Sequence, residues 1–157
     1  MRQDPIVETT RGTVRGVWEG DTAVFRGIPF AQPPVGKLRF RPPAPPERWD
    51  GVRQAIRFGE LVPQTAESPI DKALLPDVPQ GDDCLNLNVW TAEPGDGSMP
   101  VMVWIHGGSF KWGAGSCPMY DGAAFPRDGV VTARSTIGSS PPASSTSGTG
   151  RVPGTSA

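Results

Sequence analysis

The residues best placed to do chemistry are His106, Gly107, Gly108 and Ser109, which directly follow an uninterrupted apolar run at 101–105. Glycine has no Cβ, so the backbone can turn sharply there and bring its N–H groups close to a ligand oxygen. Donors aimed at one point stabilise the charge that develops on a carbonyl oxygen during acyl transfer, each by about 3 kcal/mol. We therefore assign Gly107 and Gly108 to a candidate oxyanion hole, with His106 shaping the loop. A plain Gly-rich turn is the alternative that the motif alone leaves open.

The elements that must position this loop are short strands. An unbroken apolar run such as 101–105 is typical of a strand covered on both faces inside a sheet. Alternation over 85–90 predicts a strand with one packed face and one more polar face. Two β-type runs, 13–18 and 22–28, predict a hairpin. The turn-like residues 128–131 are expected to enter a further strand.

Between Pro29 and Trp49 seven positions are proline. Each ring fixes φ and removes an N–H donor, so ladders and helices are disfavoured. We expect an extended loop that follows the surface. The apolar residues expected to pin it to a core are Ile28, Phe30, Leu38, Phe40 and Trp49.

Composition excludes several classes of protein. The net charge of −1 gives no electrostatic case for nucleic acid or a membrane surface as partner. Gly 20 and Pro 19 in 157 residues exclude coiled coils and helix bundles. One His and two Cys are too few for a structural zinc site, so we expect no metal and no cofactor. The N-terminus has no apolar signal segment and no window could span a membrane, so the expected location is cytoplasmic.

The composition changes after residue 131. Residues 132–157 are rich in Ser, Thr, Gly and Pro and contain no acidic or aromatic residue. Such a segment buries too little apolar surface to offset about 1–2 kcal/mol of ordering entropy per residue. We expect a domain at 1–131 and a disordered tail at 132–157, which would leave the apolar strand at 101–105 near an open edge of its sheet.

Six motifs occur in order along the chain: FRGIPFA (25–31), PPVG (33–36), LRF (38–40), DCLNLNVW (83–90), VWIHGG (103–108) and YDG (120–122). Together they resemble the N-terminal part of the type-B carboxylesterases, the cholinesterase and carboxylesterase branch of the α/β-hydrolases, over about residues 6–131. The resemblance implies an α/β architecture, here a partial α/β-hydrolase fold with only the N-terminal β-hairpin and the first strands of the central sheet. It also implies a serine ester hydrolase that acts on small-molecule carboxylic esters.

The resemblance assigns roles to particular residues. The oxyanion donors map to Gly108 and Ser109, where Ser109 replaces a third glycine of the family. A family ion pair maps to Arg39 with Asp82, near the site. Cys84 matches a disulfide cysteine of the family, but the segment that should hold its partner has no Cys, so a buried thiol is expected.

The catalytic triad of the family is missing from these residues. No G-x-S-x-G sequence occurs and His106 is the only histidine, so we expect the chain alone to be inactive on esters. If the codons from Ser135 onward are read in a shifted frame, they permit the sequence Val-Asn-Tyr-Arg-Leu. This sequence resembles the strand that follows at this point in family members. We interpret residues 132–157 as out-of-frame translation in a truncated esterase; the alternative is a non-catalytic cholinesterase-like binding module.

Overall fold

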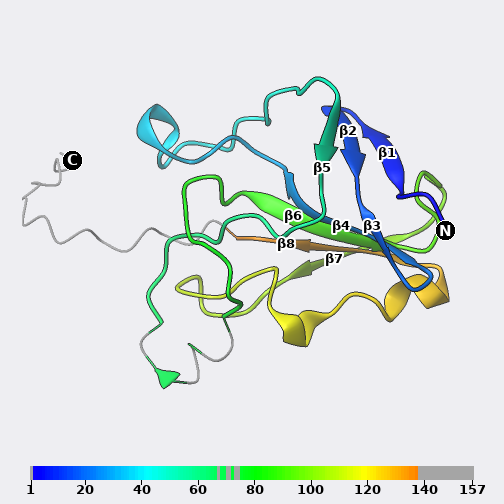
Figure 1. Cartoon of the computed structure of the whole chain (residues 1–157). Helices are drawn as coiled ribbons and strands as arrows, with labels where there is room; N and C mark the ends of the chain where they lie inside the picture. The colour runs from blue at the N-terminus through cyan, green and yellow to red at the C-terminus, as the bar shows by residue number, and fades with distance from the viewer. Residues whose placement is uncertain (1, 67, 70–71, 73–74, 138–157) are drawn as a thin grey trace, which may run out of the picture.

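The computed structural model describes residues 2–66, 68–69, 72 and 75–137, whose strands form two sheets (Figure 1). The smaller sheet has the order β1-β2-β5, with β1 at Ile6–Thr9, β2 at Gly12–Arg15 and β5 at Val52–Gln54. The larger sheet has the order β3-β4-β6-β8-β7. Its strands are β3 (Val17–Glu19), β4 (Thr22–Pro29), β6 (Asn86–Thr91), β8 (Val131–Ser135) and β7 (Val101–Ile105). The 3-10 helices are η1 (Gly36–Leu38), η2 (Pro118–Tyr120) and η3 (Phe125–Asp128).

The two strands nearest the candidate loop run parallel. β7 pairs with β8 from Val101 opposite Val131 to Ile105 opposite Ser135. The pairs β3 with β4, β4 with β6, and β6 with β8 are antiparallel. His106 therefore follows the carboxyl end of an edge strand of the larger sheet, where the chain leaves the ladder.

The predicted hairpin forms, but its first strand is shared between the sheets. β2 belongs to the smaller sheet, and after Gly16 the chain enters β3, which pairs with β4. A Cβ on Gly16 would meet the carbonyl oxygen of Val24 and the ring of Phe25, so only glycine lets the chain pass between the sheets. The turn between β3 and β4 is at Gly20 and Asp21, as predicted.

The more polar face of β6 is its buried face, which differs from the simple alternation expected. Asn88 is 1% exposed, and its Oδ1 accepts a hydrogen bond of 3.0 Å from the backbone N–H of Gly27. The β4–β6 register shifts between Phe25 and Ile28, which leaves that N–H without a ladder partner. The buried side chain of Asn88 therefore accepts the hydrogen bond that the β-bulge in β4 leaves free. In β6, a polar residue is not an exposed residue.

The main core lies between the two sheets. Val14, Ala23, Phe25 and Ala55 are buried together, and Ile28, Trp49 and Val89 pack against them. The proline-rich loop is pinned at its end, because Trp49 Nε1 donates 2.9 Å to the carbonyl oxygen of Thr13.

The expected pinning of this loop holds only in part. Phe40 is 80% exposed and Phe30 is 36% exposed. Phe40 adopts a φ of 58°, in the left-handed region that residues with a Cβ rarely adopt. Ala31 is the loop residue that is buried instead, in a second cluster with Val62, Cys84 and Leu85.

β7 is not covered on both faces, contrary to the expectation from its apolar sequence. Val101, Val103 and Ile105 are 60%, 60% and 62% exposed. β7 lies at the edge of the larger sheet. The smaller sheet packs against the part of the larger sheet that contains β4 and does not reach β7. A cavity of about 380 Å³ continues the apolar surface from Phe25 and Val89 outward to Val101 and Val131.

Ordered structure continues past the expected boundary at 132. β8 extends to Ser135, and Thr136 donates its Oγ1–H to the carbonyl oxygen of Cys84 at 2.7 Å. Thr132 and Arg134 are almost fully buried although the segment lacks large apolar residues. β8 lies between β6 and β7, and the ladders on both sides satisfy its backbone. The tail expected to be disordered lies, from residue 138 onward, outside the described residues.

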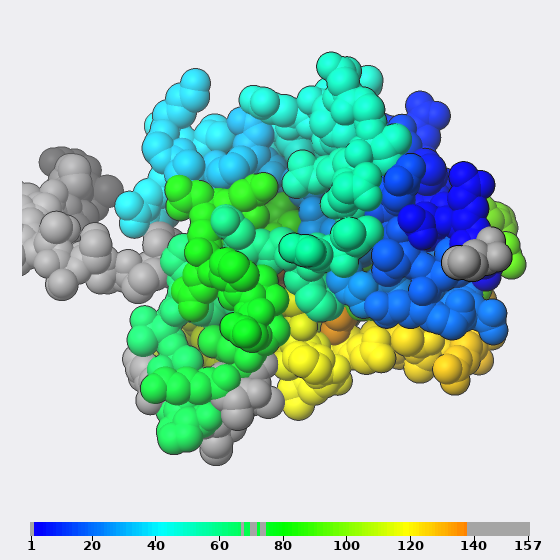
Figure 2. Space-filling model, in the orientation of Figure 1, coloured from blue at the N-terminus to red at the C-terminus, as the bar shows by residue number. Residues whose placement is uncertain are grey.

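The space-filling view shows how the sheets and loops are layered. The blue and cyan N-terminal segments lie on the upper side, and the yellow segments that follow β7 lie on the lower side (Figure 2). No helix among the described residues is long and apolar enough to cross a membrane.

Candidate functional site

The loop after β7 folds back on itself in one tight turn. The carbonyl oxygen of Gly108 accepts hydrogen bonds from the N–H groups of Lys111 at 2.9 Å and Trp112 at 3.3 Å. Gly108 has a φ of 116°, and a Cβ there would collide with the carbonyl oxygen of Trp112. Only glycine can occupy position 108 in this turn. A Cβ on Gly107, in contrast, would meet no atom within 4 Å.

The next two residues also have left-handed backbone conformations. Ser109 has a φ of 56° and Phe110 a φ of 60°. This region disfavours residues with a Cβ by about 1–2 kcal/mol. Strain of this kind is held in place by surrounding structure and is common at ligand sites.

The turn leaves a row of N–H donors unused. Within the described part of the chain, no hydrogen bond is donated by the backbone N–H of Gly107, Gly108, Ser109 or Phe110. Gly107 and Ser109 are exposed and Gly108 is half-buried, so these donors are accessible from outside. A ligand oxygen could accept bonds from several of them. The structure thus brings the three residues assigned from the sequence into one turn with free donors.

His106 lies under this turn. Its side chain is 8% exposed, and its Nδ1 donates 2.7 Å to the carbonyl oxygen of Gly107. A Cβ on Gly113 would collide with the imidazole, so the two ends of the loop are in close contact at the ring. His106 is therefore placed to fix the shape of the loop, with one ring nitrogen engaged by backbone.

A residue that sequence reasoning missed holds the far end of the loop. Gln64 donates its Nε2–H to the carbonyl oxygens of Gly113 at 3.0 Å and Val62 at 3.1 Å. Its Oε1 accepts a 2.6 Å bond from the N–H of Gly113. Gln80 extends the network, because its Oε1 accepts a 2.7 Å bond from the N–H of Gln64. The sequence signal was weak: a single Gln in a segment without periodicity.

The chain after the loop is fastened to the larger sheet by Arg134 on β8. Its guanidinium donates to the carbonyl oxygens of Cys117 and Tyr120 and lies 4.1 Å from the ring centre of Trp90. Burial lowers the pKa of this guanidinium to about 10. The ring of Tyr120 contacts that of Trp104 on β7, with centroids 5.4 Å apart.

The expected ion pair between Arg39 and Asp82 does not form. Among the described residues, the guanidinium of Arg39 lies over the ring of Phe40, and the ion pairs are Arg26 with Glu19 and Arg53 with Asp83. The reason is that residues 38–40 lie on the exposed part of the proline-rich loop.

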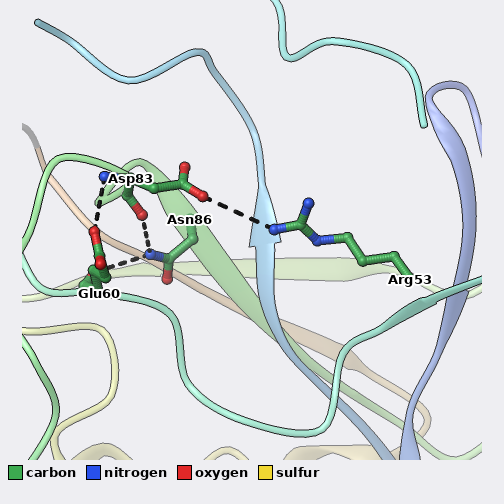
Figure 3. A network of polar contacts seen from close by, with 4 residues as sticks. All are labelled: Arg53, Glu60, Asp83 and Asn86. Atoms are coloured by element: carbon green, nitrogen blue, oxygen red, sulfur yellow. Dashed lines mark hydrogen bonds and ion pairs between the residues drawn. The ribbon is translucent and has the colours of Figure 1, made fainter.

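A different polar network fastens the entrance to β6 (Figure 3). Glu60 accepts a 2.9 Å bond from the N–H of Asp83, and its own carbonyl oxygen accepts 3.0 Å from Nδ2 of Asn86. Arg53 on β5 approaches Asp83 at 4.0 Å. Both partners of that pair are partly exposed, so the network acts mainly through hydrogen bonds.

Cys84 is a buried free thiol, as predicted. Burial raises its pKa above the ordinary range of a thiol, and the nearby carboxylates of Asp83, Asp82 and Glu60 add to the shift. A thiol in this setting is a weak nucleophile. Cys84 therefore belongs to the small core with Ala31 and Leu85.

The arrangement of strands that ends in this glycine turn is the partial fold of an α/β-hydrolase. A solved PNB esterase is 40% identical and matches with a TM-score of 0.77 over 85% of this chain and 28% of that protein. The sequence model of the Carboxylesterase family matches residues 3–134, and the chain belongs to this family. The resemblance drawn from the sequence motifs is confirmed.

Several curated relatives match the same region. A phenmedipham hydrolase of Pseudarthrobacter oxydans is 47% identical over 128 residues, which is 80% of this chain and 26% of that protein. A para-nitrobenzyl esterase of Bacillus subtilis is 43% identical over 127 residues, which is 80% of this chain and 26% of that protein. The chain thus spans about a quarter of the length of these relatives.

Proposed function

We propose that this chain carries the oxyanion-binding part of a serine carboxylic ester hydrolase for small-molecule esters. The observation that carries the proposal is the row of free N–H groups at Gly107, Gly108 and Ser109, set in a turn that only glycine at 108 permits. When a nucleophile attacks an ester carbonyl, negative charge moves to the carbonyl oxygen. Backbone donors already in position stabilise that charge without reorganisation.

The chain itself provides the donors but no nucleophile and base. It contains no G-x-S-x-G sequence and one histidine, His106, whose Nδ1 is engaged by the backbone of Gly107. An oxyanion hole alone cannot form and resolve an acyl-enzyme. We therefore expect the purified 157-residue chain to hydrolyse a p-nitrophenyl ester no faster than buffer. A burst of nitrophenol stoichiometric with protein would contradict this.

The test of the oxyanion role uses a gene in which the shifted frame near codons 131–134 is restored. We expect the longer product to contain G-x-S-x-G and to hydrolyse simple esters. In that product, Gly108→Ala should lower kcat by about a hundredfold, because its Cβ collides with Trp112 and moves the donors. Gly97→Ala is the matched control and should retain activity, since its Cβ meets open space and it lies between β6 and β7, outside the proposed donors.

Two outcomes would count against the proposal in different ways. If Gly108→Ala folded and kept full activity, the oxyanion assignment would be wrong. If the restored frame met a stop codon within a few codons, the frameshift interpretation would be wrong, and the alternative of a non-catalytic binding module would gain support.

A further inference from the structure

In the described part of the chain, five buried side-chain groups that can donate a hydrogen bond have no partner and lie on three neighbouring strands. They are Nε of Arg26 on β4, Nδ2 of Asn88 and Nε1 of Trp90 on β6, and Oγ1 of Thr132 and Nε of Arg134 on β8. β4, β6 and β8 are adjacent in the larger sheet (Figure 1). Buried polar groups nearly always have partners, so a cluster of orphaned donors needs an explanation.

The strand register places these groups side by side. Asn88 lies directly opposite Arg134, and Trp90 lies directly opposite Thr132, in the antiparallel pair of β6 and β8. Side chains in such pairs point to the same face of the sheet, with Cβ atoms about 4.5–5.5 Å apart. On the other side of β6, Arg26 lies in the bulge of β4 that faces Asn88. Asn88 therefore has an arginine on the neighbouring strand to either side.

The charge of Arg134 has no counterion. Within the described residues no carboxylate forms an ion pair with it, and its guanidinium donates instead to the carbonyl oxygens of Cys117 and Tyr120. Burial lowers the pKa of Arg134 to about 10, and the exposed carboxylate of Asp121 opposes this shift only in part. A buried charge without a partner is costly, so this face of the sheet favours an anion.

An anion fits the cluster better than a water molecule does. Four of the five orphaned groups are N–H groups, which can only donate. A water molecule could accept two of these bonds, but it would leave the charge of Arg134 uncompensated. Arg134 is 2% exposed and Asn88 is 1% exposed, so the ligand must fit beneath residues 117–122. These conditions together select a small monovalent anion.

We propose that the chain binds one chloride ion on this face of the larger sheet, against Asn88 and between Arg134 and Arg26. The ion accepts hydrogen bonds from Nε of Arg134 and Nδ2 of Asn88, and its charge offsets that of Arg134. Arg26 adds its Nε, while its Nη2 remains paired with Glu19 at 2.7 Å. Arg134 belongs to the segment that we interpret as out-of-frame translation, so this site does not follow from membership of the Carboxylesterase family.

The first test is the linewidth of the chloride NMR signal of sodium chloride with the full 157-residue chain. We expect broadening in proportion to protein concentration, which added bromide reverses. Arg134→Met should abolish the broadening, because it removes the charge and the Nε donor. Arg127→Met is the matched control, since Arg127 is exposed on η3 and its change should leave the broadening intact.

The second test supplies the negative charge from within the chain. Asn88→Asp keeps the Oδ1 acceptor for the N–H of Gly27 and places a carboxylate oxygen opposite Arg134. The midpoint of urea unfolding of the unmodified chain should rise when chloride replaces gluconate at constant ionic strength, because a ligand that binds only the folded state stabilises it. Asn88→Asp should lose this dependence on chloride. Gln54→Glu adds the same charge at an exposed position and should keep it.

Three results would overturn the proposal. The first is a chloride linewidth that the folded chain leaves unchanged. The second is broadening of equal size in Arg134→Met and in the unmodified chain while circular dichroism shows the same fold. The third is a urea midpoint that is equal in chloride and gluconate, which would indicate that the orphaned donors bind no anion.

Discussion

Gln64 and Gly113 bind each other twice, amide to backbone, across 49 residues of sequence. Nε2 of Gln64 donates to the carbonyl oxygen of Gly113 at 3.0 Å, and Oε1 accepts from the N–H of Gly113 at 2.6 Å. One side chain therefore replaces a missing strand partner for the backbone at the end of the glycine loop that follows β7. The loop between His106 and Gly113 is closed at its two ends by the imidazole and by this amide.

Gln64→Ala should lower the free energy of unfolding by about 1–3 kcal/mol, because it leaves two backbone groups of Gly113 unpaired. Urea unfolding at one protein concentration measures the change, and amide hydrogen exchange in 106–113 should increase. Gln54→Ala is the control, since Gln54 is exposed and makes only a 3.5 Å bond to Val52. Equal effects of the two variants would refute the role of Gln64.

Ser109→Gly should stabilise the chain by about 1 kcal/mol. Serine at a φ of 56° carries a left-handed penalty that glycine does not. Ser98→Gly, at an exposed turn residue without positive φ, should give no gain. Thermal unfolding of the two variants makes the comparison, and a loss of stability in Ser109→Gly would show that its hydroxyl or Cβ holds the loop.

Substitutions at Gly27 and Gly20 allow the cost of close packing to be measured apart from the cost of backbone strain. Both have positive φ, 68° and 60°, but a Cβ on Gly27 would lie 2.8 Å from the carbonyl oxygen of Arg57, whereas a Cβ on Gly20 would meet open space. Gly20→Ala should cost about 1 kcal/mol of unfolding free energy. Gly27→Ala should cost clearly more, since the β-bulge must move. Similar losses in urea titrations would mean that the segment at 57–59 gives way freely.

The raised pKa of the buried Cys84 thiol predicts that the free energy of unfolding falls at alkaline pH. Burial raises its folded-state pKa, so the unfolded chain releases this proton first as pH rises above the ordinary thiol pKa of about 8.5. Its contribution is fully present below that pH and is lost as pH rises through the folded-state pKa. Cys84→Ala should therefore flatten the fall in unfolding free energy over this range. An unchanged slope would contradict the prediction.

Short-range patterns predicted most strands of the larger sheet and placed them well, but they missed β1 and β5 and did not predict the break at Gly16. The turn at Gly20, the strands at 86–91 and 101–105 and the strand entered near 131 all follow from residue periodicity and turn residues. The candidate site also followed from a local motif, because two glycines directly after a strand let the backbone turn and leave its N–H groups free to bind a ligand. These signals are local and are readable without knowing what lies nearby.

Burial was not readable from the same patterns. The apolar strand β7 is exposed and the asparagines of β6 are buried, because exposure depends on which strand ends the sheet and where a bulge leaves an N–H unpaired. The order in which strands pair is decided by contacts between residues far apart in the chain.

By itself, the sequence determined the family, most strands of the larger sheet and the glycines of the turn after β7, since each depends on residue types within a few positions. Only the tertiary structure decided that Gln64 fastens the turn, that Arg39 and Asp82 stay apart and that β8 continues beyond residue 132. Each of these depends on hydrogen bonds or distances between separate segments. Such contacts leave no periodic trace in the sequence, so they become visible only when the two sheets are assembled.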